Sequence, residues 1–384
     1  MDERTRVLAA GRDPARNEGA VAPPIHRHST VVLERYADLY RDDIRTYGLE
    51  GGAVHEALRA ALIGVEGGAG CELVPSGLSA CALALMAFVS AGDHVLVPDS
   101  VYGPTRRLLR GTLARFGVTA DWYDPRIDGP GLDALLQPNT RMVWLESPGS
   151  LTFEVQDVPA LAAVCTARGV MTAIDNTWAG GVYFKPFDHG VDLSIQALTK
   201  YQAGHADVLA GAVLSRSAAQ AKRVRATFKE LGLGLSPDDA ALILRGMRTM
   251  HLRMEAQDAS ARAIATWMEA RPEVARILHP ALPSSPDHAL WARDFTGAAG
   301  LFGVVLHPVD EARVAAMLEG YSLFSMGFSW GGYESLVIPC DQQLGQRTIA
   351  WRAEGPLLRY SIGLETTADL IADLEAGFAR LNGS

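Results

Sequence analysis

The sequence predicts an α/β protein, with a mostly parallel sheet in a large amino-terminal domain and a smaller α+β domain at the carboxyl end. Between residues 70 and 215, short apolar runs alternate with segments of helical periodicity. This alternation is typical of parallel strands joined by crossover helices and buried on both faces. A long helical pattern follows, and after it come short strand patterns closed by a helix. A chain of 384 residues also exceeds what one core usually supports.

The first part of the chain divides into an arm and a large domain. Residues 1–50 have no clear periodicity and contain several proline and glycine residues, so we expect an extended arm that reaches a neighbouring subunit. The large domain is expected over residues 51–245. Its strand patterns lie at 71–76, 94–99, 118–124, 141–148 and 170–175, and its helical patterns at 79–92, 104–117 and 158–169.

The second part of the chain is expected to form the small domain, over residues 246–384. Ser236 is a helix N-cap and Pro237 suits the first helical turn, and helical spacing then continues past residue 265 as a connector. Three strand patterns and a final helix follow. They lie at 300–308, 335–339, 357–363 and 367–381.

Composition excludes several classes of function. The net charge of -9 comes without long charged runs, which argues against nucleic-acid binding. The four cysteines form no CxxC pair, and the first residues are charged where a secretory signal is apolar. The apolar run at 80–89 is shorter than the roughly 18 residues of a membrane span. We therefore expect a cytoplasmic protein without a metal, a nucleic-acid partner or a membrane partner.

Lys200, in "ALTKYQAGHADVLAG", is the first candidate for chemistry because it follows a buried strand pattern. Burial disfavours the charged ammonium and lowers the pKa of a lysine, and a neutral amine is a nucleophile. Such amines condense with carbonyl compounds, of which pyridoxal phosphate is the commonest in proteins. The alternatives are an exposed loop lysine or half of a salt bridge, so the neighbouring motifs must decide.

Two further motifs match the needs of pyridoxal phosphate. Asp175 ends the strand pattern "AID" and lies 25 residues before Lys200, so its carboxylate is a candidate partner of the pyridine nitrogen. Its alternative role is to cap the next turn. Ser76 and Gly77 lie between a strand and a helix, where free backbone N–H groups bind anions, although Ser-Gly turns are also common.

Three side chains complete this set. Tyr102 lies in the loop after a strand and is able to stack on a planar ring, the alternative being a half-buried loop tyrosine. Thr199 adds a hydroxyl group for a phosphate. Arg359 lies in a strand pattern, where its guanidinium group is suited to a bidentate contact with an amino-acid carboxylate or to a structural ion pair.

Four segments make the chain similar to a known family over essentially its whole length. They are "AIDNTW", "ALTKYQAGHADVLAG", "LSPDDAALILRGMRTMHLRM" and "SWGGYESLVIP". On these segments the chain resembles the Cys/Met-metabolism family of pyridoxal-phosphate-dependent enzymes. The segments "LESPGSLTFEVQDVP" and "FSMGFSWGGYESL" are most similar to the cystathionine β-lyase branch of that family.

The resemblance implies a fold, an assembly and a site. The fold is aspartate-aminotransferase-like, and the assembly is a homotetramer of dimers with active sites at subunit interfaces. Lys200 would anchor pyridoxal 5'-phosphate covalently and move the substrate's α-proton, Asp175 would pair with the ring nitrogen, and Tyr102 would stack on the ring. The remaining implied residues are Gly77, Leu78, Thr199 and the neighbouring subunit's Tyr47 for the phosphate, and Arg359, Trp330 and Tyr47 for the substrate.

The resemblance also implies a reaction. It is the β-cleavage of a carbon–sulfur bond in cystathionine or a related cysteine thioether. The products are a thiol, which is homocysteine when the substrate is cystathionine, together with pyruvate and ammonia. The reaction belongs to transsulfuration and methionine biosynthesis. Two alternatives stay open. One is a γ-lyase or γ-synthase of the same family, and the other is a catalytically retired subunit that binds pyridoxal phosphate and serves in an assembly.

Two positions depart from the family pattern. Leu49 stands two residues after Tyr47, where the family usually has a phosphate-binding arginine, and Leu198 stands two residues before Lys200, where serine is frequent. We expect both replacements to remove a phosphate partner. If residues 45–51 run extended, Arg45, Tyr47 and Leu49 share one side of the chain. On that basis we expect Arg45 of the neighbouring subunit to supply part of the compensation for the missing arginine.

Overall fold

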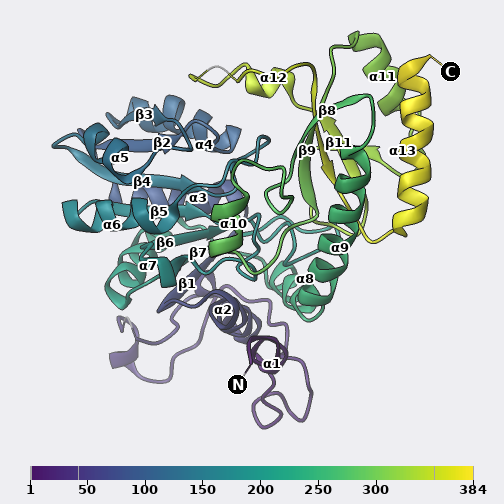
Figure 1. The fold of residues 1–384 in the computed structure, drawn as a ribbon. Coiled ribbons are helices and arrows are strands. Elements are labelled where there is room, and N and C mark those ends of the chain that lie inside the picture. The colour runs from purple at the N-terminus through teal and green to yellow at the C-terminus, as the bar shows by residue number, and fades with distance from the viewer. Residues whose placement is uncertain (1, 42, 350, 384) are drawn as a thin grey trace.

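The computed structural model describes residues 2–41, 43–349 and 351–383 and contains two sheets (Figure 1). A seven-stranded sheet with its helices forms one half of the molecule, and a five-stranded sheet covered by the carboxyl-terminal helix forms the other. The amino-terminal residues extend below both halves in this view.

The large sheet has the strand order β1-β7-β6-β5-β4-β2-β3. Its strands are β1 (Gly70–Val74), β2 (His94–Pro98), β3 (Thr119–Tyr123), β4 (Thr140–Glu146), β5 (Met171–Asp175), β6 (Leu193–Gln196) and β7 (Gly211–Ser215). Only β7 runs antiparallel to its neighbours. The predicted mostly parallel sheet is therefore confirmed, and all five predicted strands are present. The strand β7 was not predicted, because its five residues follow β6 through an irregular loop without an intervening helix.

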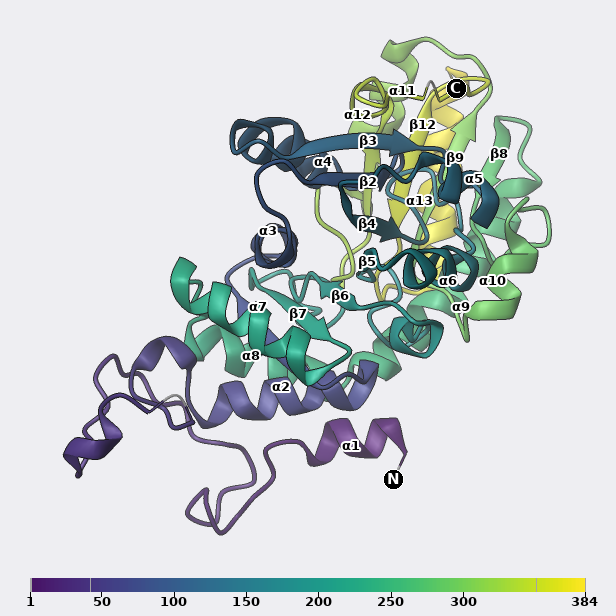
Figure 2. The ribbon, with the colours of Figure 1, turned by 90° about the vertical axis from the view of Figure 1, so that its left-hand side faces the viewer.

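The large sheet is buried on both faces. Along β4, Met142 and Trp144 pack into one apolar cluster while Val143 and Leu145 pack into another on the opposite face. Helices from both sides supply these clusters (Figure 2). The helical segments are α2 (Ala53–Glu66), α3 (Gly77–Phe88), α4 (Gly103–Leu108), η3 (Leu109–Leu113), α5 (Gly129–Leu135), α6 (Val158–Arg168), η4 (Pro186–His189), α7 (Ala218–Leu231) and α8 (Pro237–Met247).

The long helix predicted after Ser236 is in fact two helices, α8 and α9 (Met250–Glu269), which is a correction. The carbonyl of Gly246 accepts hydrogen bonds from the Thr249 N–H at 3.1 Å and from Arg253 Nη2 at 2.8 Å. A Cβ at Gly246 would lie 2.2 Å from the carbonyl oxygen of Ala203. The periodicity of the sequence continues through the break because both helices bury the same kind of apolar face.

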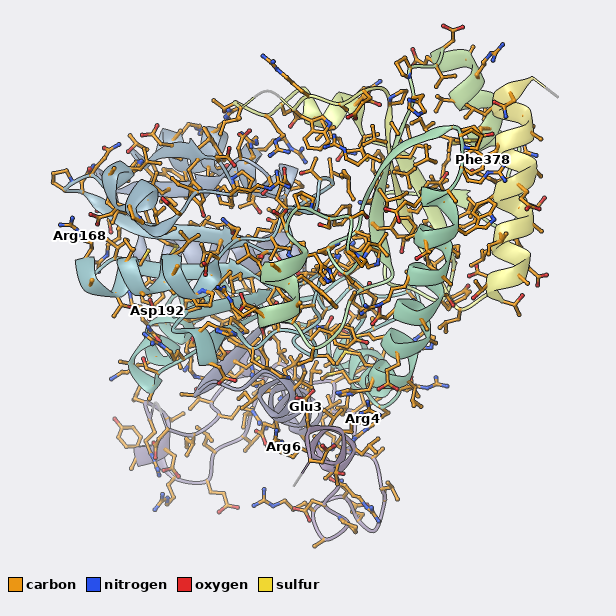
Figure 3. The ribbon with its side chains drawn as sticks, in the orientation of Figure 1. Glu3, Arg4, Arg6, Arg168, Asp192 and Phe378 are labelled. Atoms are coloured by element: carbon orange, nitrogen blue, oxygen red, sulfur yellow. The ribbon has the colours of Figure 1, made fainter. Side chains whose placement is uncertain are left out.

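The small sheet has the order β10-β11-β12-β9-β8. The three predicted strands and the final helix are confirmed, whereas β8, β10 and three short helices were not predicted. The elements are β8 (Val274–Leu278), α10 (His288–Asp294), β9 (Leu301–Leu306), α11 (Glu311–Glu319), β10 (Ser325–Met326), β11 (Leu336–Pro339), α12 (Asp341–Leu344), β12 (Leu357–Ser361) and α13 (Thr367–Asn382). Phe378 of α13 faces this sheet and packs in its core (Figure 3).

Helix α9 joins two apolar cores. Met250 and Met254 pack in the core of the large sheet, and Ile264 and Met268 pack in the core of the small sheet. One helix therefore holds the two sheets together. The division of the chain at residues 245 and 246 stays a prediction.

The amino-terminal arm is not irregular throughout. Residues Glu3–Ala9 form helix α1, and the 3-10 turns η1 (Tyr36–Asp38) and η2 (Gly48–Glu50) follow later in the arm. Glu3 of α1 pairs with Lys185 at 2.6 Å and with His251 at 2.9 Å, in the region where Figure 3 labels Glu3. A helix of seven residues is too short to give a clear periodicity, so the sequence did not indicate it.

Two features of the described residues concern a membrane and a metal ion. None of their helices is long and apolar enough to cross a lipid bilayer. They also contain no group of three or more histidine, cysteine, aspartate or glutamate residues placed to hold a metal ion.

Candidate active site

A cavity of about 550 Å³ lies where the carboxyl ends of β4, β5 and β6 face the small domain. Ligands of open α/β sheets bind at such strand ends. Eight of the nine predicted site residues line this cavity, and Tyr47 does not. The eight are Gly77, Leu78, Tyr102, Asp175, Thr199, Lys200, Trp330 and Arg359.

Lys200 lies inside this cavity rather than on an exposed loop. Its Nζ donates to Ser329 Oγ at 2.9 Å and lies 5.1 Å from the centre of the Trp330 ring. Burial, together with the charge of Arg359, lowers the pKa of Lys200 from its ordinary 10.5 to about 8. Among the described residues no carboxylate forms an ion pair with Lys200. The structure thus favours the nucleophilic amine over both alternatives.

Asp175 ends β5 with one carboxylate oxygen occupied and the other without a described partner. Its Oδ1 accepts from the Thr177 N–H at 3.1 Å and from Thr177 Oγ1 at 2.6 Å. Thr177 Oγ1 accepts in turn from the Ala197 N–H at 2.9 Å, which ties the acid to the loop of Lys200. Burial raises the pKa of Asp175, while the Thr177 hydrogen bonds lower it. Asp175 therefore caps a turn and still presents Oδ2 for a ligand.

The start of α3 forms a cradle for an anion. Ser76 Oγ accepts from the Ser79 N–H at 3.0 Å, while the N–H groups of Gly77 and Leu78 have no acceptor within the described part of the chain. A Cβ on Gly77 would lie 2.7 Å from the Cβ of Ala197. Glycine is therefore required for the helix to approach the loop of Lys200, and two free N–H groups suit a phosphate there.

Thr199 and Leu198 differ in their relation to this cradle. Thr199 lines the cavity, but its Oγ1 is hydrogen bonded to the backbone of Ala210, to the carbonyl at 3.2 Å and from the N–H at 3.1 Å. Leu198 is buried in the core, whereas Ala197 lines the cavity. The expectation that a serine at position 198 would contact the phosphate is therefore wrong, because that side chain points away from the site.

Tyr102 begins α4 and is held in place by Glu146. The Tyr102 N–H donates to Glu146 Oε2 at 2.8 Å, and the tyrosine side chain lines the cavity. Glu146 ends β4 directly beside Asp175 in the sheet register. Burial and the nearby Asp175 charge raise the pKa of Glu146 well above its ordinary range. The sequence placed Glu146 at a strand end but assigned it no role.

Arg359 of β12 is buried and directed at the same cavity. Its Nη2 donates to the carbonyls of Phe328 at 2.9 Å and Ser329 at 3.1 Å, while its buried Nε has no partner among the described residues. Burial lowers the pKa of Arg359 to about 10. No described carboxylate pairs with it, so the structural ion pair is excluded for the described residues. A guanidinium group with an unused donor fits a substrate carboxylate.

Ser329 is a site residue that the sequence did not reveal. Ser329 accepts a hydrogen bond from Lys200 through its Oγ and one from Arg359 through its carbonyl. It lies 129 positions after Lys200 in an irregular segment, so neither spacing nor periodicity indicated the contact. The motif "SWGG" that begins with Ser329 was the one available signal.

Tyr47 and Arg45, the site residues expected from the arm, do not line the cavity of their own chain. Tyr47 is 55% exposed and bridges to Thr30. The expected extended run through Leu49 is wrong, because residues 48–50 form the turn η2 and Leu49 packs near Gly234. Arg45 forms an ion pair with Glu56 of its own chain. Within one chain, Arg45 is therefore not placed to compensate for Leu49.

These groups fit pyridoxal phosphate. Lys200 supplies an amine of lowered pKa for the aldehyde, Asp175 an oxygen without a partner for the ring nitrogen, and the α3 cradle two N–H groups for the phosphate. The unused Nε of Arg359 leaves a donor for an amino-acid carboxylate. A cavity with this set has the parts that amino-acid chemistry on this cofactor needs.

Comparisons with known proteins identify the family of this chain. The family model described as Cys/Met metabolism PLP-dependent enzyme matches residues 4–379. A relative in Rhizobium johnstonii is 47% identical over 98% of this chain and 95% of its own length. The cystathionine beta-lyase MetC of Escherichia coli is 42% identical over 98% of each chain.

A solved structure extends the likeness to the whole fold. The crystal structure of a cystathionine gamma synthase from Xanthomonas oryzae pv. oryzae, in complex with cystathionine, superposes with a TM-score of 0.92 and 32% sequence identity. The match covers 100% of this chain and 99% of that one. The predicted fold of pyridoxal-phosphate enzymes is thereby confirmed, and the chain belongs to the Cys/Met-metabolism family of PLP-dependent enzymes.

Proposed function

We propose that this protein is a carbon–sulfur β-lyase that cleaves cystathionine, or a related cysteine thioether, to homocysteine or another thiol, pyruvate and ammonia. The observation that carries the proposal is the convergence of Lys200, Asp175 and Arg359 on one cavity of about 550 Å³. The identity of 42% to a cystathionine beta-lyase, against 32% to a gamma synthase of known structure, supports β-cleavage over the γ-reactions.

The residues of the cavity divide the work of this reaction. When bound, pyridoxal phosphate supplies an electron sink that stabilises negative charge at the substrate's Cα. Arg359 holds the α-carboxylate, and Trp330 forms the wall beside Lys200. The Lys200 amine, with its pKa near 8, takes the proton from Cα at neutral to mildly alkaline pH. The sulfur then leaves Cβ as a thiolate.

The proposed cofactor contacts follow the same geometry. Asp175 would pair with the ring nitrogen, Tyr102 would contact the ring, and the Gly77 and Leu78 N–H groups would bind the phosphate. Thr199 contributes its hydroxyl only if that group leaves Ala210. A phosphate held by few side chains should bind with lower affinity than one that has an additional arginine.

The keto acid decides between β- and γ-chemistry. Cystathionine and water should give homocysteine, pyruvate and ammonia, because 2-aminoacrylate released after β-cleavage hydrolyses to the last two. Purified enzyme is incubated with cystathionine and the keto acid is identified by chromatography. Pyruvate supports the proposal, and 2-oxobutyrate identifies a γ-lyase. Bound cofactor without turnover of any thioether amino acid identifies a retired assembly subunit.

We also propose that the working protein is a cytoplasmic homotetramer in which the arm completes the neighbouring subunit's site. Three side chains of the arm are almost fully exposed, and Tyr47 is 55% exposed. Their exposed fractions are 88% for Val32, 84% for Tyr36 and 89% for Tyr40. Apolar side chains exposed to this degree are typical of an interface.

A complementation experiment tests this assembly. Lys200→Ala and Tyr47→Ala chains, each inactive alone, are mixed and allowed to exchange subunits. A mixed dimer should regain up to half of the wild-type activity, because one of its two sites is intact. The whole mixture should regain about a quarter, because about half of its dimers are mixed. The mass from light scattering gives the number of subunits. Failure of complementation with confirmed subunit exchange would mean that Tyr47 acts within its own chain.

A further inference from the structure

Glu66, the last residue of helix α2, occupies a position that is unfavourable for an acid. It is 4% exposed, and no described cation forms an ion pair with it. A negative charge at the carboxyl end of a helix opposes the helix dipole, and a buried carboxylate is costly without strong compensation. Burial accordingly raises the pKa of Glu66. Glu66 does not line the active-site cavity.

Three neutral side chains compensate for this burial. Glu66 Oε1 accepts from Asn176 Nδ2 at 2.7 Å and from the hydroxyl of Ser194. Glu66 Oε2 accepts from Gln196 Nε2 at 2.9 Å. Asn176 directly follows β5, Ser194 lies within β6, and Gln196 is the last residue of β6. The acid of one helix therefore holds together the two strand ends that carry the proposed site residues.

Two of these donors, Asn176 and Gln196, connect Glu66 to proposed site residues. Asn176 directly follows Asp175, and side chains alternate between the two faces of a strand. Glu66 therefore contacts the sheet on the face opposite the cavity. Gln196 Oε1 accepts from Gln202 Nε2 at 3.0 Å, which closes the loop that contains Lys200. Gln196 Nε2 also donates to the carbonyl of Asn176 at 3.2 Å, so the two branches are joined.

The three contacts suit an acid at position 66 better than an amide. All three neighbours donate to Glu66, and an ionised carboxylate accepts only. A glutamine at this position would turn an N–H₂ group against a donor and leave one hydrogen bond unmade. The nearest lysine, Lys185, does not replace them, because its Nζ donates to the carbonyl of Gly181 at 2.7 Å, to the carbonyl of Val65 and to Glu3.

We propose that Glu66 is a positioning residue of the active site, which fixes the spacing between Asp175 and the loop of Lys200 from behind the sheet. The inference rests on the proposed roles of Asp175 and Lys200. A displacement of about 1 Å between such groups is enough to slow a reaction on the order of a hundredfold. The geometric requirement of the reaction explains why the acid is retained at a position where it is otherwise unfavourable.

Glu66→Gln tests the proposal, with Asp373→Asn as the matched control. Asp373 is also a buried acid, 9% exposed, and accepts from the N–H groups of Ser322 and Leu323 in the small domain. The readouts are amide hydrogen exchange of the full-length chain with and without pyridoxal phosphate, the visible absorption band of the bound cofactor, and kcat and KM for cystathionine. Gln196→Met, which breaks the link to Gln202, serves as the second variant if Glu66→Gln does not fold.

The proposal predicts a local signature. In Glu66→Gln, exchange should quicken about tenfold at residues 173–180 and 196–204 and stay unchanged in the small domain, because about one hydrogen bond is lost there. The cofactor band should shift its pH midpoint, and kcat should fall about tenfold to a hundredfold with a smaller change in KM. Asp373→Asn should lower Tm without these effects.

Two results would overturn the inference. One is exchange that quickens equally throughout the chain, which would make Glu66 a general stabilising residue. The other is an unchanged cofactor band and kcat in a folded variant. If the wild-type enzyme releases no pyruvate from cystathionine, the proposed function fails instead, and the exchange pattern and the cofactor band still decide the role of Glu66.

Discussion

The cavity and the arm differ in how one chain positions its functional side chains. In the cavity, Lys200, Asp175 and Arg359 are each held by at least one hydrogen bond from the same chain. In the arm, Tyr47 is 55% exposed and Arg45 forms an ion pair with Glu56 on the surface. One chain therefore holds in place the groups proposed for proton transfer and carboxylate binding, whereas the proposed role of the arm residues requires assembly with a second subunit.

The first way to test this comparison is to remove the group at the centre of the cavity. Lys200→Ala should abolish the visible band of the bound cofactor and lower the rate of pyruvate release by about 10⁴-fold or more, because one amine is both anchor and base. Absorbance and keto-acid assays measure the two effects. Wild-type turnover in this variant would remove the central assignment.

The second test measures the preparation of Lys200 without any cofactor. The fall of its pKa from 10.5 to about 8 corresponds to roughly a 300-fold change in proton affinity. Lys200 should be mostly protonated below pH 8 and should react increasingly with an amine reagent as the pH rises through 8, well before an ordinary lysine does. Peptide mass spectrometry of the cofactor-free chain follows the reaction, with exposed Lys222 as reference. A midpoint near 10.5 would contradict a prepared amine.

The third test concerns the acid of the cavity. Asp175→Asn should leave Tm nearly unchanged and slow the reaction by about a hundredfold, because a neutral partner no longer holds the proton on the ring nitrogen. Thr177→Val should produce a smaller loss, since the carboxylate stays but loses its 2.6 Å hydrogen bond. Single-turnover kinetics with saturating cofactor separate chemistry from cofactor loss. Equal rates in Asp175→Asn and wild type would refute the assigned role.

The fourth test concerns Arg359. Arg359→Gln should reduce kcat/KM for cystathionine by about tenfold to a hundredfold, the value of one charge-assisted contact, mostly through KM. The same change should leave cofactor binding in place, because the proposed phosphate site is formed by the start of α3 and not by Arg359. Steady-state kinetics and a cofactor titration are the measurements. A loss of cofactor with unchanged KM would show that Arg359 supports the fold instead.

The smallest effect is expected in the arm. Arg45→Ala should change the dissociation constant of pyridoxal phosphate by less than about twofold, because Arg45 pairs with Glu56 and an exposed pair contributes little. Leu49→Arg should not tighten the cofactor, since position 49 packs near Gly234. Fluorescence titration of the assembled protein decides both. A clear loosening in Arg45→Ala would show that assembly redirects this side chain to the phosphate.

Much of the cavity was predictable from the sequence because it is built from strand ends. In a parallel sheet the residues after successive strands meet at one edge, so Asp175, Thr199 and Lys200 could be placed together from periodicity alone. The resemblance to a family added Trp330 and Leu78, which local patterns do not single out. Helix α1 was not predictable because seven residues are too few for a clear periodicity, and the break between α8 and α9 was not predictable because it depends on the close approach of Gly246 to Ala203.

What the sequence by itself determined is the order of buried strands and helices, the polar residues at their ends and the family they belong to, since these follow from local periodicity and motif spacing. Only the tertiary structure decided which atoms meet. It joined Ser329 to Lys200 across 129 positions and placed Glu66 beneath Asn176 and Gln196. It also turned Leu49 inward at η2. Contacts between distant segments depend on how whole elements pack, and no local pattern encodes that packing.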